Sequence, residues 1–215
     1  MRLYKYIKVF AGLTQSEVKT LYENGHILVN DKLYPFSYNI KENDIVKLNG
    51  KIIERIPFVY YLYYKPNGIL SDISKDPCSY QFHIDKDIKL MPAGRLDKDS
   101  EGLMILTNDG AFINFLTKSN IEKEYIVRLD KKVDDAFLKN LIKPIVIKSK
   151  LTKKMKVEKI DDYTIKLILF DGRYHQIRRS VKASFNKVIS LKRIRIGSYL
   201  LSDMRPNELR EIKKD

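Results

Sequence analysis

Apolar and polar positions alternate at helical spacing in the first part of the chain. Residues 2–11 place apolar side chains three or four positions apart, which predicts an amphipathic helix that ends at Gly12. Residues 14–17 read Thr-Gln-Ser-Glu and fit the capping box of a second helix, which runs to Gly25. Residues 51–57 read as a short linker. Between helix and linker, strands are expected at 26–29, 32–34 and 45–48.

The remaining pattern mixes strand-like runs with three helical stretches. Helices are predicted at 134–141, at 174–185 and after Asp109, whose carboxylate can cap a helix that carries Phe112 and Leu116. Strands are predicted at 58–64, 103–106, 125–129, 143–156, 156–160, 163–170 and 189–201. Such a mixture favours an α+β protein with a mainly antiparallel, mixed central sheet.

Length and composition are those of an ordinary globular protein. At 215 residues and 44% hydrophobic content, the chain suggests one or two domains with a buried core. No apolar run is long enough to cross a bilayer and the N-terminus has no separate apolar segment, so we expect a soluble, cytoplasmic protein. The one cysteine, Cys78, has no partner for a disulfide and no neighbours at zinc-ligand spacing, so we expect it to be structural or incidental.

The charge balance indicates a polyanionic partner. Lys and Arg number 41 against 27 Asp and Glu, a net charge of +14, and nucleic acid is the natural candidate. The excess is uneven, because the segment from Gly172 to Ser202 contains no acidic residue. Its basic residues are Arg173, Arg178, Arg179, Lys182, Lys187, Lys192, Arg193 and Arg195. Since ordinary surfaces mix both signs, this segment is predicted to form a basic binding surface.

A polar loop in front of an apolar run is the strongest candidate for chemistry. Gly94-Arg95-Leu96-Asp97 precedes the run 103–106, which Asn108-Asp109-Gly110 closes as a turn. A cation and an anion two residues apart, on a loop held by a buried strand, are a common arrangement in active sites. An Asp beside Gly also commonly caps a helix or makes a turn, so the residues alone leave both readings open.

The loop belongs to a longer string that resembles a known family. Residues 94–110, GRLDKDSEGLMILTNDG, resemble the signature of the RsuA-type pseudouridine synthases. Two more strings of that family stand in the right order, Lys65-Pro66-Asn67-Gly68 upstream and GRYHQIRR at 172–179 downstream. The two predicted N-terminal helices and the hairpin strands after them, including 25–31, resemble an S4 RNA-binding domain. The resemblance covers nearly the whole chain.

The resemblance implies a domain order and a reaction. An S4-like domain at 1–56 would precede a pseudouridine synthase domain at 57–215, whose mainly antiparallel mixed sheet is flanked by helices. The reaction breaks the N1–C1′ bond of a uridine, turns the base and rejoins it through C5. This isomerisation requires no cofactor and no metal, and the sequence has no Walker or dinucleotide-binding motif.

The resemblance also implies a partner, namely ribosomal RNA or a ribosomal subunit assembly intermediate, bound by a monomer. The compact two-domain layout without a long basic tail favours 16S rRNA of the small subunit. One alternative is 23S rRNA of the large subunit. A second alternative, favoured by composition alone, is a non-catalytic RNA-binding factor of ribosome assembly.

Three residues match the family's catalytic positions. Asp97 falls on the catalytic aspartate, which the chemistry needs ionised beside the anomeric carbon. Arg178 matches the basic residue that pairs with that aspartate, although a phosphate contact is its plainer reading. Tyr125, in a Lys-x-Tyr motif, matches the tyrosine that packs on the uracil and takes part in removing the C5 proton, although a core tyrosine is its plainer reading.

Further residues are expected to bind the substrate or the RNA. Arg95 would occupy the space left by the extruded nucleotide, and Ile177 would line the uracil pocket unless it is ordinary helix core. The predicted substrate contacts are Arg95, Ile177, Lys65 and Gly94. The predicted RNA contacts are Arg2, Lys5, Lys19, Arg179, Lys182 and Arg193. Two departures from the family pattern stand close together: Ser180 replaces a usual Met, and the segment 185–188, Phe-Asn-Lys-Val, lacks a common glycine.

Overall fold

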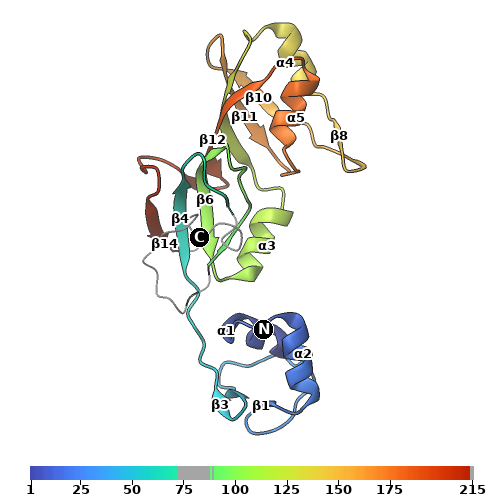
Figure 1. The fold of residues 1–215 in the computed structure, drawn as a ribbon, viewed down its shortest axis with the longest axis vertical. Helices are drawn as coiled ribbons and strands as arrows, with labels where there is room; N and C mark the ends of the chain where they lie inside the picture. The colour runs from blue at the N-terminus through green and yellow to red at the C-terminus, as the bar shows by residue number, and fades with distance from the viewer. Residues whose placement is uncertain (72–87, 89, 214–215) are drawn as a thin grey trace. The chain divides into compact units, whose positions relative to one another are not determined.

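A computed structural model of the chain describes residues 1–71, 88 and 90–213 (Figure 1). The chain forms two units, one made mainly by Met1–Phe58 and the other by most of the chain from Val59 onward. Each unit has its own hydrophobic core. Cys78 lies outside the described residues. Within the described ranges, no helix is both long and apolar enough to span a bilayer.

Two helices and an antiparallel three-stranded sheet make up the N-terminal unit. Its elements are α1 (Leu3–Phe10), α2 (Gln15–Glu23), β1 (Ile27–Val29), β2 (Val46–Leu48) and β3 (Lys51–Ile52). The predicted capping box is confirmed, because the Glu17 N–H donates to Thr14 Oγ1 and the Thr14 N–H donates to the Glu17 carboxylate. Both predicted helices are therefore present at the expected places.

Two predictions for this unit are wrong. Residues 32–34 form no strand, and only an isolated bridge links Val29 to Lys32. Lys51 and Ile52 are not linker, because they pair with β2. The turn between these strands is Asn49-Gly50, with positive φ at both residues, which is the two-residue hairpin geometry that Asn-Gly favours.

The C-terminal unit is built on one nine-stranded sheet in the order β10-β11-β7-β12-β6-β4-β14, with β13 beside β12 and β5 beside β6 (Figure 1). The strands are β4 (Tyr60–Lys65), β5 (Met91–Pro92), β6 (Glu101–Thr107), β7 (Lys123–Leu129), β10 (Lys156–Lys159), β11 (Thr164–Leu169), β12 (Val188–Ile196), β13 (Tyr199–Leu200) and β14 (Leu209–Ile212). β12 and β6 pair parallel, whereas the other pairs are antiparallel. The predicted mainly antiparallel, mixed sheet is confirmed.

Three helices and a small hairpin accompany this sheet. The helices are α3 (Gly110–Lys118), α4 (Asp135–Leu141) and α5 (Gln176–Ala183). Asp109 caps α3 by accepting from the N–H groups of Ala111 and Phe112, as predicted, and Asp134 caps α4. The basic stretch predicted as exposed strand is the hairpin of β8 (Val146–Ile147) and β9 (Lys150–Leu151).

The end of the chain differs from its predicted pattern. The strand expected at 189–201 turns at Gly197, which separates β12 from β13. The helix expected at 174–185 is shorter, because His175 and Phe185 both have positive φ and bound α5. β14 was not predicted, and it completes the sheet by pairing with β4.

A close approach between β6 and β12 positions the candidate loop. Gly102 has φ +110°, and a Cβ atom there would lie 2.2 Å from the carbonyl oxygen of Arg193. Only glycine allows this contact. On the other side of β12, Arg193 is in register with Tyr125 of β7. β12 therefore lies between β6, which follows the Asp97 loop, and β7, which carries Tyr125.

Candidate active site

Asp97 lies on the loop between β5 and β6, and hydrogen bonds hold the loop in place. The Leu96 N–H donates to Ser71 Oγ at 3.0 Å, and the Ser71 hydroxyl donates to the Leu96 carbonyl at 2.7 Å. The Ser100 N–H donates to the Asp97 carbonyl at 3.1 Å. Leu96 is itself buried, so the backbone on either side of Asp97 is anchored. Such anchoring keeps the carboxylate in one place.

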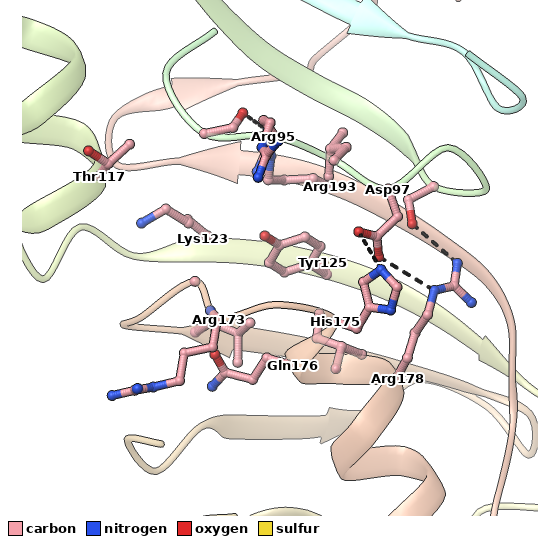
Figure 2. Close-up of a pocket in the computed structure, with 16 residues that line it drawn as sticks. Arg95, Asp97, Thr117, Lys123, Tyr125, Arg173, His175, Gln176, Arg178 and Arg193 are labelled. Carbon is pink, nitrogen blue, oxygen red and sulfur yellow. Dashed lines mark hydrogen bonds and ion pairs between the residues drawn. The ribbon is translucent and has the colours of Figure 1, made fainter. Parts of the chain in front are cut away.

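Two cationic or polar side chains from the start of α5 face the Asp97 carboxylate. Asp97 Oδ1 lies 3.3 Å from His175 Nε2, and Asp97 Oδ2 lies 3.6 Å from Arg178 Nε (Figure 2). The second distance is too long for a hydrogen bond, and Arg178 Nε has no hydrogen-bond partner in the part of the chain that the structure describes. Asp97 and Arg178 are therefore in charge contact without a hydrogen bond, and the Nε–H group of Arg178 remains available to donate one to Asp97.

The rest of the Arg178 guanidinium is tied to the same loop. Nη2 lies 3.0 Å from Asp99 Oδ2 and donates to the Asp99 carbonyl and to Ser100 Oγ. Asp99 is largely exposed, whereas Ser100 is buried. The arginine therefore joins α5 to the Asp97 loop through several donors, as its planar fork permits.

Tyr125 forms a wall of the pocket into which Asp97 faces. Burial alternates along β7, so Lys123, Tyr125 and Val127 lie on its buried face. A cavity of about 140 Å³ is lined by Asp97, Tyr125, Ile177, Gly94, Arg95 and His175, among others. This is smaller than a typical pocket for a drug-sized ligand, and its size suits a single planar base.

A hydrogen-bond network among Asp171, Arg173 and Gln176 flanks His175 at the start of α5. Asp171 accepts from Arg173 Nε at 3.2 Å and from Gln176 Nε2 at 2.7 Å, while Gln176 Oε1 accepts from the Arg173 N–H at 3.0 Å. His175 has φ +51°, a left-handed conformation that few non-glycine residues adopt and that histidine adopts more often than most of them. Strained backbone of this kind is frequent where a side chain is aimed at a site.

Sequence reasoning assigned no role to His175 or Lys123. His175 stands in the GRYHQIRR string directly before α5, and Lys123 opens the Lys-x-Tyr motif, so both signals were present. Lys123 is buried and lines the pocket, and its ammonium group donates to the Ile121 carbonyl at 3.0 Å. Burial, and to a lesser extent the nearby Arg193 charge, lower the pKa of Lys123 below its usual range.

Two predicted contacts are corrected by burial. Lys65 is 0% exposed, and its ammonium group donates to the carbonyls of Pro66 and Ile69 at 2.8 and 2.6 Å. Burial lowers the pKa of Lys65 to about 8, against the opposing effect of nearby carboxylates. Lys65 therefore supports the loops from inside and does not line the pocket. Gly94, Arg95 and Ile177 do line it.

Arg193 is the second correction. It is 2% exposed, and its Nε donates to the Leu103 carbonyl at 2.7 Å while Nη2 reaches the Gly94 carbonyl at 3.4 Å. Its guanidinium ties β12 to the start of the candidate loop and lines the pocket that Asp97 faces, so it is not part of an open RNA-binding surface. The other predicted RNA contacts are exposed side chains, namely Arg2, Lys5, Lys19, Arg179 and Lys182.

The segment from Gly172 to Ser202 contains no acidic residue, but acidic residues from other parts of the chain pair with several of its basic residues. Arg195 pairs with Glu122 at 2.9 Å and with Glu124 at 2.8 Å, because β12 lies beside β7. Arg173 pairs with Asp171, and Arg178 with the Asp97 loop. Exposed basic residues remain on α5 and just after it, at Arg179, Lys182 and Lys187. The described residues show no group of His, Cys, Asp and Glu side chains arranged to hold a metal ion.

The sequence similarities decide the family. The profile of the family described as RNA pseudouridylate synthase matches residues 59–183. A protein of Aquifex aeolicus described as an uncharacterized RNA pseudouridine synthase is 37% identical to the chain over its whole length and over 94% of the Aquifex protein. This chain is an RNA pseudouridine synthase family member. The resemblance carried by the 94–110 string is confirmed.

Other family members are about equally similar to this synthase. The dual-specificity RNA pseudouridine synthase RluF of Shigella flexneri is 33% identical over the whole chain, which spans 76% of that protein. The ribosomal small subunit pseudouridine synthase A of Haemophilus influenzae is 33% identical over 94% of the chain and 91% of its own length. A crystal structure of a pseudouridylate synthase matches 99% of the chain and 96% of its own with a TM-score of 0.71 and 31% identity.

Proposed function

We propose that this synthase isomerises a specific uridine of ribosomal RNA and that Asp97 is its catalytic residue. The observation that supports this most is the position of the Asp97 carboxylate, which faces a base-sized pocket between His175 and Arg178. The reaction is balanced within the nucleotide: the N1–C1′ bond breaks, a C5–C1′ bond forms, C5 loses a proton and N1 gains one. No electron acceptor or donor takes part.

Asp97 supplies the ionised carboxylate beside the anomeric carbon. A carboxylate can attack C1′ directly or assist formation of a glycal, and both routes need it charged. The Arg178 guanidinium lies 3.6 Å from Asp97 Oδ2 and supplies a positive charge that matches the carboxylate. The free N–H of Arg178 Nε can close on Asp97 when RNA excludes water from the site, since catalytic hydrogen bonds commonly tighten in the substrate complex.

Tyr125 and Arg95 act on the base and on the space around it. Tyr125 lines the pocket, and in this proposal its ring packs on the uracil while its hydroxyl takes part in removing the C5 proton. The pocket admits one base, so the uridine must leave its stack to enter. Arg95 is exposed at the pocket rim and occupies the vacated position in the RNA. Ile177 is buried and gives the pocket an apolar side.

We propose that the substrate is 16S rRNA or an assembly intermediate of the small subunit, and that the enzyme acts on it in the cytoplasm as a monomer. The similarity to the Haemophilus small subunit synthase over 91% of that protein's length supports this choice. The equal similarity to RluF makes 23S rRNA the alternative. Mapping pseudouridines in rRNA from cells with and without this enzyme tests the choice: loss of a 16S site supports it, and loss confined to 23S rRNA overturns it.

Residues 1–56 are proposed to be an S4-like domain that docks RNA without chemistry. This segment holds nine basic and six acidic residues, a net of +3, which leaves +11 of the total +14 for the remainder. Its role is orientation of a folded RNA, in keeping with RNA recognition by shape. A chain beginning at Pro57 is expected to bind RNA with poorer discrimination between the true target and a scrambled structured RNA. An unchanged ratio of kcat/KM on the two RNAs would contradict this division.

A matched pair of substitutions tests the catalytic role of Asp97. Asp97→Asn removes the carboxylate that faces the pocket, and Asp99→Asn removes the largely exposed carboxylate two residues later. We expect Asp97→Asn to abolish pseudouridine formation while RNA binding persists. Asp99→Asn should retain turnover, because the amide oxygen of asparagine still accepts a hydrogen bond from Arg178 Nη2. Turnover by Asp97→Asn would contradict the catalytic role of Asp97. Restoration of ribosome assembly in cells by Asp97→Asn, without any pseudouridine, would favour the non-catalytic assembly factor instead.

A further inference from the structure

The C-terminal end of α5 carries a side chain that its surroundings do not explain. Phe185 is 80% exposed and has φ +63°. It occupies the left-handed position that follows the helix, because the Phe185 N–H donates to the Lys182 carbonyl and the Asn186 N–H donates to the Val181 carbonyl. This hydrogen-bond pair is a Schellman motif, whose left-handed residue is usually glycine. A bulky residue there is strained.

The backbone that presents Phe185 is firmly held. Lys131 Nζ donates to the Phe185 carbonyl at 3.0 Å. The next residue, Asn186, is buried and accepts from the Lys131 and Lys187 N–H groups, and its amide donates to the Lys131 carbonyl. The ring therefore projects into solvent from a rigid base. Neither burial nor a favourable backbone conformation accounts for a phenylalanine at this position. This points to a contact outside the chain.

Basic residues lead from the active site to this ring along α5. Exposed side chains recur at Arg179, Lys182 and Phe185, three residues apart, so the two cations share one face of the helix. At the other end of α5, Tyr174 is 55% exposed, and the Arg179 guanidinium lies 5.5 Å from its ring centre. Since a helix rises about 1.5 Å per residue, Phe185 lies roughly 15 Å from His175, the residue in contact with Asp97.

The ring also borders a cavity of suitable chemistry. Phe185 lines it together with Lys131, Lys132, Asn140 and Asn186, with Asp134 as the one acidic side chain. Lys131 and Lys132 are exposed cations, although Lys132 is paired with Asp162 at 3.2 Å. Cations beside an open aromatic face are the combination with which proteins hold single-stranded nucleic acid.

We propose that the exposed face of α5 is a track for the RNA strand next to the target uridine, with Arg179 and Lys182 on its phosphates and Phe185 stacked on one of its bases. The proposal rests on the proposed function, because the strand on the track is the one that presents its uridine to Asp97. The phosphates supply the anions that match the two cations, and the base supplies a flat apolar face for the ring. The track begins at the pocket and ends a few nucleotides away from it.

The test uses the full-length enzyme and two fluorescein-labelled probes, a short single-stranded RNA and the same strand with abasic sugars. Phe185→Gly removes the ring and relieves the left-handed backbone, whereas Phe185→Tyr keeps a ring. Leu200→Ala serves as the control, since Leu200 is also exposed but lies on β13 beyond the far end of β12. Each variant is measured for Kd on both probes by anisotropy and for thermal stability.

We expect Phe185→Gly to bind the base-containing RNA about 5- to 150-fold more weakly, the range for one stacked base, and the abasic RNA almost as the wild type does. Its melting temperature should be unchanged or higher, and Phe185→Tyr and Leu200→Ala should retain binding. RNA affinity would then fall without a loss of thermal stability, whereas a purely structural role for Phe185 would lower both.

The proposal is overturned if Phe185→Gly binds the base-containing RNA as the wild type does. The ring would then contact a protein or have no partner. It is also overturned if Phe185→Gly loses affinity for both probes together with thermal stability. These readouts do not depend on catalysis. An enzyme that forms no pseudouridine but shows the Phe185-dependent preference for bases would refute the proposed function and leave the track standing as an RNA site.

Discussion

Arg178 Nε lies 3.6 Å from Asp97 Oδ2, while Nη2 of the same guanidinium lies 3.0 Å from Asp99 Oδ2. One arginine therefore serves two carboxylates of a single loop, and the shorter contact goes to the exposed one. The Nε group that faces Asp97 is buried and has no hydrogen-bond partner among the described residues. A buried donor without an acceptor is unfavourable, so closure of this pair on substrate binding would be favourable.

Replacement of Arg178 should act on the chemical step. Arg178→Ala leaves Asp97 without its cation, and we expect kcat to fall about 100- to 1,000-fold, the usual loss for one electrostatic group of an active site. Arg178→Lys keeps the charge but not the planar fork that joins Asp97, Asp99 and Ser100, so its kcat should be intermediate. Single-turnover rates at saturating RNA measure this, with Lys139→Ala of α4 as an exposed control. Wild-type rates for Arg178→Ala would show that the pair is only structural.

Removal of the Tyr125 hydroxyl should separate packing from proton transfer. Tyr125→Phe keeps the ring in the pocket, so affinity for RNA and stability should be close to those of the wild type. Loss of a group that moves the C5 proton should lower the rate about 100- to 10,000-fold. Release of tritium from C5-labelled uridine in RNA follows this step directly, with Tyr163→Phe as a control on an exposed tyrosine. Unchanged tritium release would return Tyr125 to the role of a core residue.

Lys65 should make stability depend on pH in an unusual direction. Burial lowers its pKa in the folded protein to about 8, from an ordinary value of 10.5. Between these values the unfolded chain binds more protons than the folded one, so the free energy of unfolding rises with pH, by at most about 1.4 kcal/mol per pH unit. Below about pH 8 both states carry the proton and the unfavourable burial of the charge is fully present.

Urea unfolding of the wild type and of Lys65→Met at several pH values measures this effect. The stability of the wild type relative to the variant should increase as pH rises from about 8 toward 10.5, whatever the variant loses by leaving carbonyls unpaired. A difference that stays flat across this range would mean that Lys65 titrates normally and is not confined as the structure has it.

Salt dependence should separate exposed cations from those already paired with carboxylates. Arg179→Ala and Lys182→Ala each remove an exposed cation, and each should reduce the slope of log K against log salt by about 0.7. Arg195→Ala removes a cation that is held by Glu122 and Glu124, so it should leave the slope nearly unchanged. Equal slopes for all three variants would show that RNA does not follow α5.

The sequence alone was sufficient to predict helix caps whose hydrogen bonds join residues only a few positions apart. The capping box at Thr14 and Glu17 and the cap of Asp109 on α3 involve partners three positions apart or fewer, so the residues that define them are visible side by side in the sequence. The strand at 125–129 was also predicted from local pattern, and β7 contains it, although its hydrogen-bond partners in β11 and β12 are distant in the sequence. The Asp97 loop was singled out by a long string that belongs to the family's signature, and the family itself is confirmed.

Tertiary structure decided which charges are available and which are not. From the sequence, Arg193 was predicted to contact RNA and Lys65 to contact the substrate, but pairing of β12 with β6 and of β4 with β6 buries them against backbone carbonyls. Arg195 lies in an acid-free segment, yet acids 71 and 73 residues away neutralise it across the sheet. The candidate active site also depends on tertiary structure, because Arg178 of α5 contacts a loop about 79 residues earlier in the chain. Periodicity reports only the environment of each residue along its own element, whereas the partners of a buried charge depend on which strands lie side by side, and that is set by packing of the whole sheet.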